Sequence, residues 1–133
     1  MGSVGAGARV IQGDGNLWNE SLGHRPGGAQ VAREISGILQ RIRDDSALDP
    51  DDRELAIEKT EAVAAALSAA DDSPGQLRKA LRDAKSFLSS RASWVWDRVC
   101  QVLTTEAGLQ ILGSITDVAA KAAIHGILGI TVA

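Results

Sequence analysis

The sequence predicts an all-α fold, in which a small four-helix bundle follows a glycine-rich N-terminal motif. Apolar residues recur at helical spacing along most of the chain, and two strong helix-start signals divide it. Apolar residues make up 44% of the 133 residues but aromatic residues only 3%, so the core must be built from Ala, Leu, Ile and Val. A chain of this length has room for one domain. We expect a motif and linker over residues 1–28 and a helical bundle over residues 29–133.

The first two helices are marked by an apolar face and by a proline-led start. The first spans residues 29–44. The second begins with Asp49 as N-cap and Pro50 in the first helical position, followed by two aspartates that favour the positive end of the helix dipole. It ends near residue 70. The residues expected to face the core are Val31, Ile35, Ile38, Leu39 and Ile42 in the first helix and Leu55, Ala56, Ala62, Val63, Ala66 and Leu67 in the second.

A third helix is expected to begin at Ser73, and a fourth near Thr105. The run from Ser73 to Gln76 fits a capping box. Apolar positions then continue through Val102 in one long helix, which the serines at 89, 90 and 93 would weaken or kink midway. The fourth helix runs to the end of the sequence. The core-facing residues expected in the third helix are Leu77, Leu81, Ala84, Leu88, Val95, Val99 and Val102.

Residues 1–28 have a different character, with recurrent glycine and no helical apolar period. Two short β-competent pieces, Val10–Gln12 and Leu17–Asn19, flank the turn formers Gly13–Asn16. A lone hairpin of this size is marginally stable in water. We therefore expect this motif to be mostly disordered in a monomer.

The sequence from Ala107 to Ala133 is almost entirely apolar or small, and its polar residues are spaced by four, three, four and four. In one helix that spacing places them on a single narrow face. Two interpretations remain open. The segment is either a central bundle helix with one wet face and an Asp117–Lys121 surface pair, or a helix that leaves the bundle for a membrane, where about 20 residues span the hydrocarbon. The polar stripe is Gln110, Ser114, Asp117, Lys121 and His125, and the apolar residues that would enter lipid are Leu109, Ile111, Leu112, Ile115, Val118, Ile124, Ile127 and Leu128.

No catalytic site, metal site or cofactor motif is evident, and we expect a protein that is not an enzyme. Gly13–Asn16 lacks the Lys-Ser/Thr pair of a phosphate loop. His24 and His125 lack the neighbours of a metal site. Cys100, the single cysteine, is interpreted as a small core residue and favours a reducing cytoplasm. The net charge of -3 argues against nucleic-acid binding.

Trp94 and Trp96 flank Val95 and therefore point to different faces of the third helix. We expect one tryptophan in the core and the other exposed. The exposed ring is either ordinary amphipathic packing or a partner or membrane surface, since tryptophan is favoured at both.

The order of these elements resembles the bacterial Bell domains. The phrases that carry the resemblance are VIQGDGNLWN before the first helix, LDPDDRELA at the second, DSPGQLRKAL at the third and the apolar C-terminal segment. Bell domains are small helical domains considered analogous to the fungal HeLo domains and to the four-helix executioner domain of the necroptosis pseudokinase. They are joined to short bacterial amyloid signalling motifs, in which Gln and Asn stack as ladders and aliphatic side chains form dry zippers. The matching amyloid motif here is Val10, Ile11, Gln12, Gly13, Asp14, Gly15, Asn16, Leu17, Trp18 and Asn19.

The resemblance implies a cell-death effector of bacterial immunity. An NLR-like receptor with a matching motif would template the amyloid motif, and self-association would concentrate the helical domains. The protein would then move from the cytoplasm to the inner membrane, bind lipids and permeabilise it. No cofactor, metal or nucleic acid is implied. The alternative is a non-enzymatic adaptor whose helical domain binds a partner protein.

The amyloid motif leads to a prediction for an isolated peptide. A synthetic peptide of residues 8–22 should form fibrils that bind thioflavin T, whereas the Ile11→Pro or Gln12→Pro peptide should not, because proline removes a backbone donor from the strand ladder. A wild-type peptide that stays monomeric at high concentration would contradict the amyloid assignment.

Overall fold

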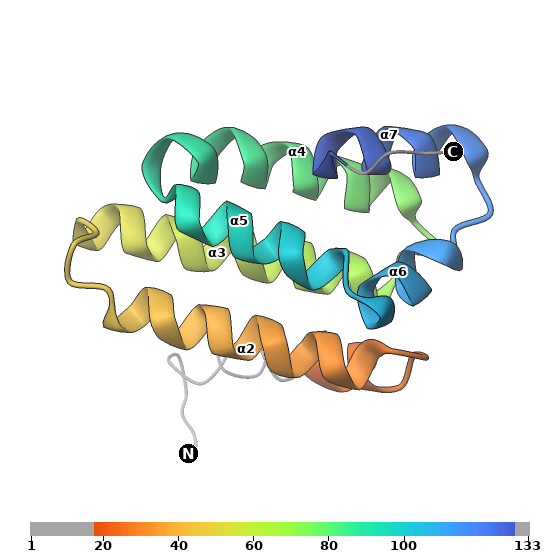
Figure 1. Ribbon diagram of the computed structural model, residues 1–133, viewed down its shortest axis with the longest axis horizontal. Helices are drawn as coiled ribbons and strands as arrows, with labels where there is room; N and C mark the ends of the chain where they lie inside the picture. Colours follow the sequence, from red (N-terminus) through yellow and green to blue (C-terminus); the bar gives the residue numbers. More distant parts are fainter. Residues whose placement is uncertain (1–17, 130–133) are drawn as a thin grey trace, which may run out of the picture.

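The computed structural model describes residues 18–129, and within that range every regular element is a helix (Figure 1). The all-α class is therefore confirmed. The expected third and fourth helices are each divided in two, so the described chain is not four continuous helices. Residues 18–23 are helical, and the labelled helices are α2 (Gly28–Asp44), α3 (Pro50–Ser68), α4 (Pro74–Arg91), α5 (Ser93–Leu103), α6 (Glu106–Gly113) and α7 (Val118–Leu128).

Helix α2 matches its prediction closely, and α3 matches in its start but less well in its buried face. All five expected core residues of α2 are buried. Helix α3 has Asp49 at its N-cap and Pro50 in its first turn, although the Asp49 side chain makes no capping hydrogen bond. Leu55 is 39% exposed and Ala62 is also exposed, contrary to expectation. The face that packs inward is rotated from the expected one and includes Ala56, Thr60, Val63, Ala64, Ala66 and Leu67.

The prediction of one long helix from Ser73 through Val102 is wrong, because the chain reverses at Ala92. Helices α4 and α5 lie antiparallel on either side of this residue (Figure 1). Ala92 leaves helical geometry at φ -151° and ψ 66°, and its N–H still donates to the Leu88 carbonyl. The expected core residues on both sides of the turn are buried, since each lies on a helix that faces the same core. The capping box at Ser73 is also absent, because the Ser73 side chain makes no capping hydrogen bond.

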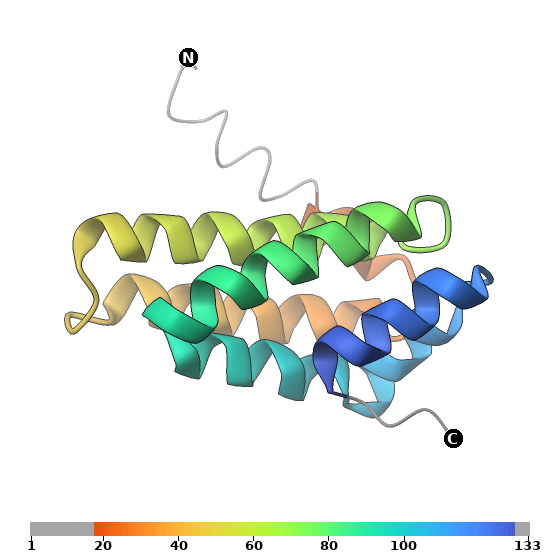
Figure 2. The same ribbon diagram turned by 90° about the horizontal axis from the view of Figure 1, so that it is seen from above.

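The helices enclose one aliphatic core. Helices α4 and α7 lie along one edge of the molecule in Figure 1 and α2 along the opposite edge, and the view from above in Figure 2 shows α7 lying beside α4. The core begins earlier in the sequence than expected. Trp18 is 7% exposed and Leu22 is fully buried, so residues 18–28, which the sequence analysis assigned to the motif and linker, belong to the packed body.

Gly27 allows the segment before α2 to approach α6 closely. Its backbone has a φ of +79°, in the left-handed region that favours glycine. A Cβ atom built on Gly27 would lie 2.7 Å from the Ala107 carbonyl oxygen and 3.0 Å from Oε1 of Gln110. Both the conformation and the contact therefore require glycine at this position.

This close approach predicts opposite effects for two glycine-to-alanine substitutions. Gly27→Ala should lower the free energy of unfolding by at least about 1 kcal/mol, because it adds a left-handed alanine and a clash with α6. Gly37→Ala is the matched control: Gly37 lies inside α2 with open space around it. That substitution should raise the free energy of unfolding by about 0.5–1 kcal/mol. Urea denaturation measures both, and equal effects would contradict the close approach of Gly27 to α6.

Candidate functional site

The segment from Thr105 to Leu128 forms two helices rather than one. Thr105 caps α6, its side chain accepting a hydrogen bond from the Gly108 N–H at 3.2 Å. Asp117 caps α7 and accepts from the Ala120 N–H at 3.1 Å. A capping side chain at Asp117 fixes a helix start there, so the expected single helix from Thr105 onward is wrong. No helix among residues 18–129 combines the length and the apolar character needed to cross a bilayer.

Most of the apolar residues assigned to the membrane-active helix lie in the bundle core. Leu109 is 42% exposed, Val118 is 80% exposed and Ile127 is partly buried. The others are buried: Ile111 and Leu112 in α6, Ile115 in the connection that follows it, and Ile124 and Leu128 in α7. In this conformation the segment packs as part of the bundle.

The polar stripe does not form one helical face, because the helix is interrupted between Gly113 and Val118. Gln110 and Ser114 are exposed at the end of α6. Asp117 is the cap of α7 and is not paired with Lys121, since the ion pairs among the described residues are Arg25–Asp71 and Arg91–Asp52. Lys121 and His125 are half-buried. The expected surface ion pair is therefore replaced by a helix cap.

Helix α7 is attached to the bundle mainly through α4. Of its 11 residues only Ile124 and Leu128 are buried. The rest of its surface is mostly small or apolar, with Lys121 the one charged residue in the helix besides the titratable His125. Burial of apolar area provides most of the stabilisation of helix packing. An apolar helix with so small a buried face is therefore only weakly stabilised against the rest of its domain.

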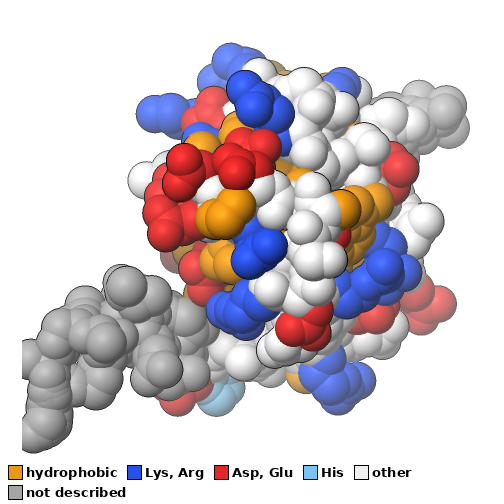
Figure 3. Space-filling model, turned by 90° about the vertical axis from the view of Figure 1, so that its left-hand side faces the viewer, with side chains coloured by type: hydrophobic (Ala, Val, Ile, Leu, Met, Phe, Trp, Pro, Cys, Tyr) orange, Lys and Arg blue, Asp and Glu red, His pale blue; other side chains and the backbone are white. Residues whose placement is uncertain are grey.

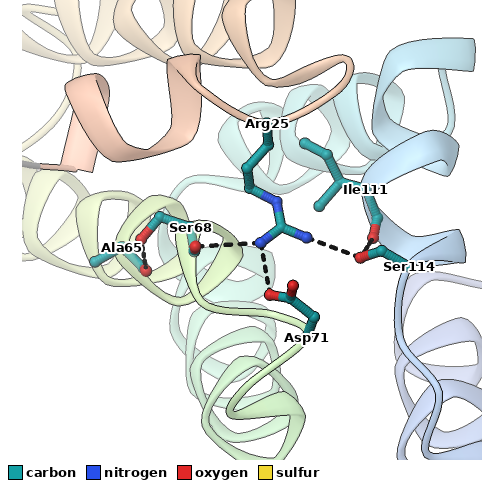
Figure 4. Close-up of polar contacts among 6 residues, drawn as sticks. All are labelled: Arg25, Ala65, Ser68, Asp71, Ile111 and Ser114. Carbon is teal, nitrogen blue, oxygen red and sulfur yellow. Dashed lines mark hydrogen bonds and ion pairs between the residues drawn. The ribbon is translucent and has the colours of Figure 1, made fainter.

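Arg25 joins three separate parts of the chain at the start of this region (Figure 4). Its Nη1 donates to Oδ1 of Asp71 at 2.7 Å and to the Ser68 carbonyl oxygen at 3.2 Å. Its Nη2 donates to Oγ of Ser114 at 2.8 Å, and that hydroxyl donates in turn to the Ile111 carbonyl oxygen. The Arg25 side chain is only 14% exposed. It thereby ties the segment before α2 both to the α3–α4 turn and to the connection between α6 and α7.

The contact with Arg25 changes the pKa of the Asp71 carboxyl group. The hydrogen bond from Arg25, together with backbone donors and the charge of the guanidinium, lowers the pKa of Asp71 below its ordinary value of 3.8. Hydrogen bonds to the ionised form and a nearby positive charge both favour that form. The contact is therefore an ion pair at neutral pH.

The expected amyloid motif is only partly covered by the structure. Val10 to Leu17 lie outside the described residues. Trp18 and Asn19 lie inside them and are helical rather than extended. The expectation that the motif is mostly disordered in a monomer is therefore wrong for Trp18 and Asn19, and the β-competence of the piece Leu17–Asn19 stays a prediction.

The tryptophan prediction is confirmed in part. Trp96 is buried, whereas Trp94 is half-buried at the end of the molecule where the α2–α3 and α4–α5 turns lie. Trp94 donates from Nε1 to Asp45 at 3.0 Å, and the Arg41 guanidinium lies 4.8 Å from its ring centroid. These residues and Asp44 line a cavity of about 360 Å³. Figure 3 shows this end, where acidic, basic and hydrophobic side chains are intermixed.

The remaining candidate groups form no cluster with recognisable chemistry. Residues 18–129 contain no arrangement of His, Cys, Asp and Glu side chains suited to a metal ion. Cys100 is partly buried, and this burial, with the charge of Asp97 adding to it, raises the pKa of its thiol. A raised pKa disfavours the reactive thiolate.

Comparison of the chain with protein-family models, with curated proteins and with solved structures found no match.

Sequence reasoning missed Arg25 and Gly27, the two residues that bind the N-terminal segment to α6. The partners of Arg25 lie 46 and 89 positions away along the chain, and no local pattern connects them. The one available signal was the Pro26–Gly28 run, which is typical of a tight turn with a special backbone conformation.

The ion pair leads to a prediction for the pH dependence of stability. Because the pKa of Asp71 is lowered in the folded state, its stabilising contribution is present above about pH 3.8, the pKa of a free aspartate, and is lost as the pH falls through the folded-state pKa. Asp71→Asn should therefore lower the free energy of unfolding at pH 7, and its difference from wild type should shrink in strong acid. Urea denaturation at a series of pH values measures this difference.

The matched control is Asp72→Asn, since the neighbouring aspartate forms no ion pair with another described residue. Its effect should be smaller at pH 7. A difference between Asp71→Asn and wild type that stays constant from neutral pH to strong acid would contradict the role of the ion pair.

Proposed function

We propose that this protein is a non-enzymatic cell-death effector of bacterial immunity that permeabilises the inner membrane after assembly through its N-terminal motif. One observation carries the proposal: α7 is an apolar helix of which only Ile124 and Leu128 are buried. A helix that buries few side chains in the core loses little stabilising apolar contact when it detaches from the bundle. Lipid offers the same side chains a larger apolar environment.

The polar spacing of the C-terminal region supports the same proposal. If the connection 114–117 became helical, α6 and α7 would merge into one helix from Glu106 to Leu128. At about 1.5 Å per residue that helix would be about 35 Å long, which exceeds the roughly 30 Å of hydrocarbon in a bilayer. Its polar residues from Gln110 to His125 would then share one face. In an oligomer such a face would line a water-filled pore, where intramembrane charges are tolerated.

Activation in this proposal begins in the cytoplasm with a receptor of the NLR-like class that carries a matching motif. Templated assembly of the motif would concentrate many helical domains at one place on the membrane. Effective concentration of this kind strengthens weak membrane binding without a new contact. The support for this step is the resemblance of VIQGDGNLWN to bacterial amyloid signalling motifs.

The decisive experiment is dye leakage from anionic liposomes with the full-length protein. Preformed fibrils of the 8–22 peptide serve as seeds, and the same samples without seeds serve as the comparison. Seeded wild-type protein should release the dye. No release under either condition would contradict permeabilisation and would favour the adaptor alternative, in which the helical domain binds a partner protein.

A surface substitution on α7 sharpens this test. Ala119→Asp should reduce seeded leakage at least about fivefold, because Ala119 would lie opposite the polar face of the merged helix and an aspartate that enters lipid costs up to about 3 kcal/mol. Ala119 is exposed in the first turn of α7, where an acidic residue also suits the helix dipole, so the folded bundle should tolerate the change.

The matched control is Ala62→Asp, the same change at an exposed alanine of α3. It should leave leakage near the wild-type rate. Equal loss of leakage in the two variants would show that α7 has no special part in the membrane step.

A further inference from the structure

Residues 18–27 form a strap that binds the start of the described chain to the core. Two of its side chains anchor it by burial: Leu22 is fully buried and Trp18 is 7% exposed. Both belong to the same apolar cluster as the helices. The strap is therefore held by the bundle and is not merely a connection to α2.

The other end of the strap contacts α6 at two points. Gly27 lies so close to the Ala107 carbonyl oxygen that even a methyl group would clash with it. Arg25 reaches the end of α6 and donates to Ser114, which is the C-cap residue of that helix. Two contacts of different kinds, one steric and one polar, thus fix the strap to the helix that precedes α7.

The hydrogen bond from Arg25 to Ser114 is important because Ser114 lies at the junction between α6 and α7. Ser114 begins the short non-helical connection that separates α6 from α7. Beyond this connection α7 rests mainly on α4 and buries only two side chains. Arg25 therefore fastens the connection at the point from which α7 could swing away or merge with α6.

Trp18 belongs to both the strap and the amyloid motif. In the structure its backbone is helical and its side chain is buried. In a cross-β arch that includes Leu17–Asn19 its backbone would be extended, and one residue cannot adopt both conformations at once. Assembly of the motif and seating of the strap therefore compete for Trp18.

We propose that the strap is an autoinhibitory clamp, which holds α6 and α7 on the bundle through Arg25 and Gly27 and is released when motif assembly withdraws Trp18 from the core. This proposal rests on the proposed function for its biological consequence. The coupling itself is a property of the folded chain. It is reciprocal, because whatever loosens the strap also favours assembly of the motif, and the converse.

The test is hydrogen–deuterium exchange of the full-length monomer, without lipid or seeds. Arg25→Met keeps most of the aliphatic stem and removes all three guanidinium hydrogen bonds. Ser114→Ala removes the hydrogen bond from Arg25 to the α6–α7 connection, together with the local bond from Ser114 to the Ile111 carbonyl, and leaves the Arg25–Asp71 pair intact. Each variant should increase the exchange rate in residues 106–128 at least about threefold. A hydrogen bond to a charged group stabilises a contact by more than a threefold change in its opening equilibrium. Exchange in α2, and in α3 before its last turn at Ser68, should stay near wild type.

The control is Ser90→Ala. Like Ser114, Ser90 is an exposed serine near a helix end whose hydroxyl donates to the carbonyl three residues earlier, but it has no contact with Arg25. It should leave exchange in α7 unchanged. If Arg25→Met unfolds the whole domain, Ser114→Ala becomes the test of the clamp. The Ser114 side chain is exposed, so its removal leaves no cavity in the core. Unchanged exchange in α6 and α7 of Ser114→Ala, or an equal increase in every helix, would overturn the clamp.

Leakage from anionic liposomes separates the clamp from the proposed function. If both hold, Ser114→Ala should leak without seeds, at a rate closer to that of seeded wild type. Faster exchange in α7 with no leakage under any condition would support the clamp and contradict membrane permeabilisation. Leakage from seeded wild-type protein, together with unchanged exchange in Ser114→Ala, would support membrane permeabilisation and contradict the clamp.

Discussion

The C-terminal half of the described chain buries its apolar surface by turning back on itself twice, and the rest of the structure depends on this. Between residues 74 and 128 the sequence is rich in aliphatic side chains, and a continuous helix would leave many of them facing water. The reversal at Ala92 places α5 against α4, and the break between α6 and α7 returns the chain to α4. With few aromatic rings available, the core relies on close approach of helices with small side chains. Gly108 illustrates this, since a Cβ there would meet the backbone at Val102 and Leu103.

These turns leave α7 as the least embedded of the labelled helices, and they place its attachment next to the N-terminal segment. A bundle that served only as a stable scaffold would gain from burying the C-terminal apolar residues more completely. Here Val118 remains 80% exposed, and the guanidinium of Arg25 joins the strap to the connection that precedes α7. A contact made of a few hydrogen bonds from one side chain is broken when that side chain moves away. That property suits a contact that has to open.

The sequence supported the prediction of helices where several local signals agreed. At α2 the apolar period located a buried face, and at α3 the Asp49–Pro50 pair located a helix start. The same reasoning failed at Ala92 and between Gly113 and Val118. Apolar periodicity reports which residues avoid water, and it continues across a tight turn when both helices face the same core. The capping role of Asp117 was available in the sequence, but the polar spacing of an uninterrupted helix explained the same residue equally well.

The sequence by itself determined the helical class, the aliphatic character of the core and the unusual composition of the two ends, because these follow from residue type and local spacing. Only the tertiary structure decided that Trp18 is buried and helical, that Gly27 lies against α6, and that Arg25 joins Asp71 to Ser114. Each of these depends on residues far apart along the chain, which approach one another only after the helices have packed. The physical link between the N-terminal segment 18–27 and the C-terminal helices is of this second kind.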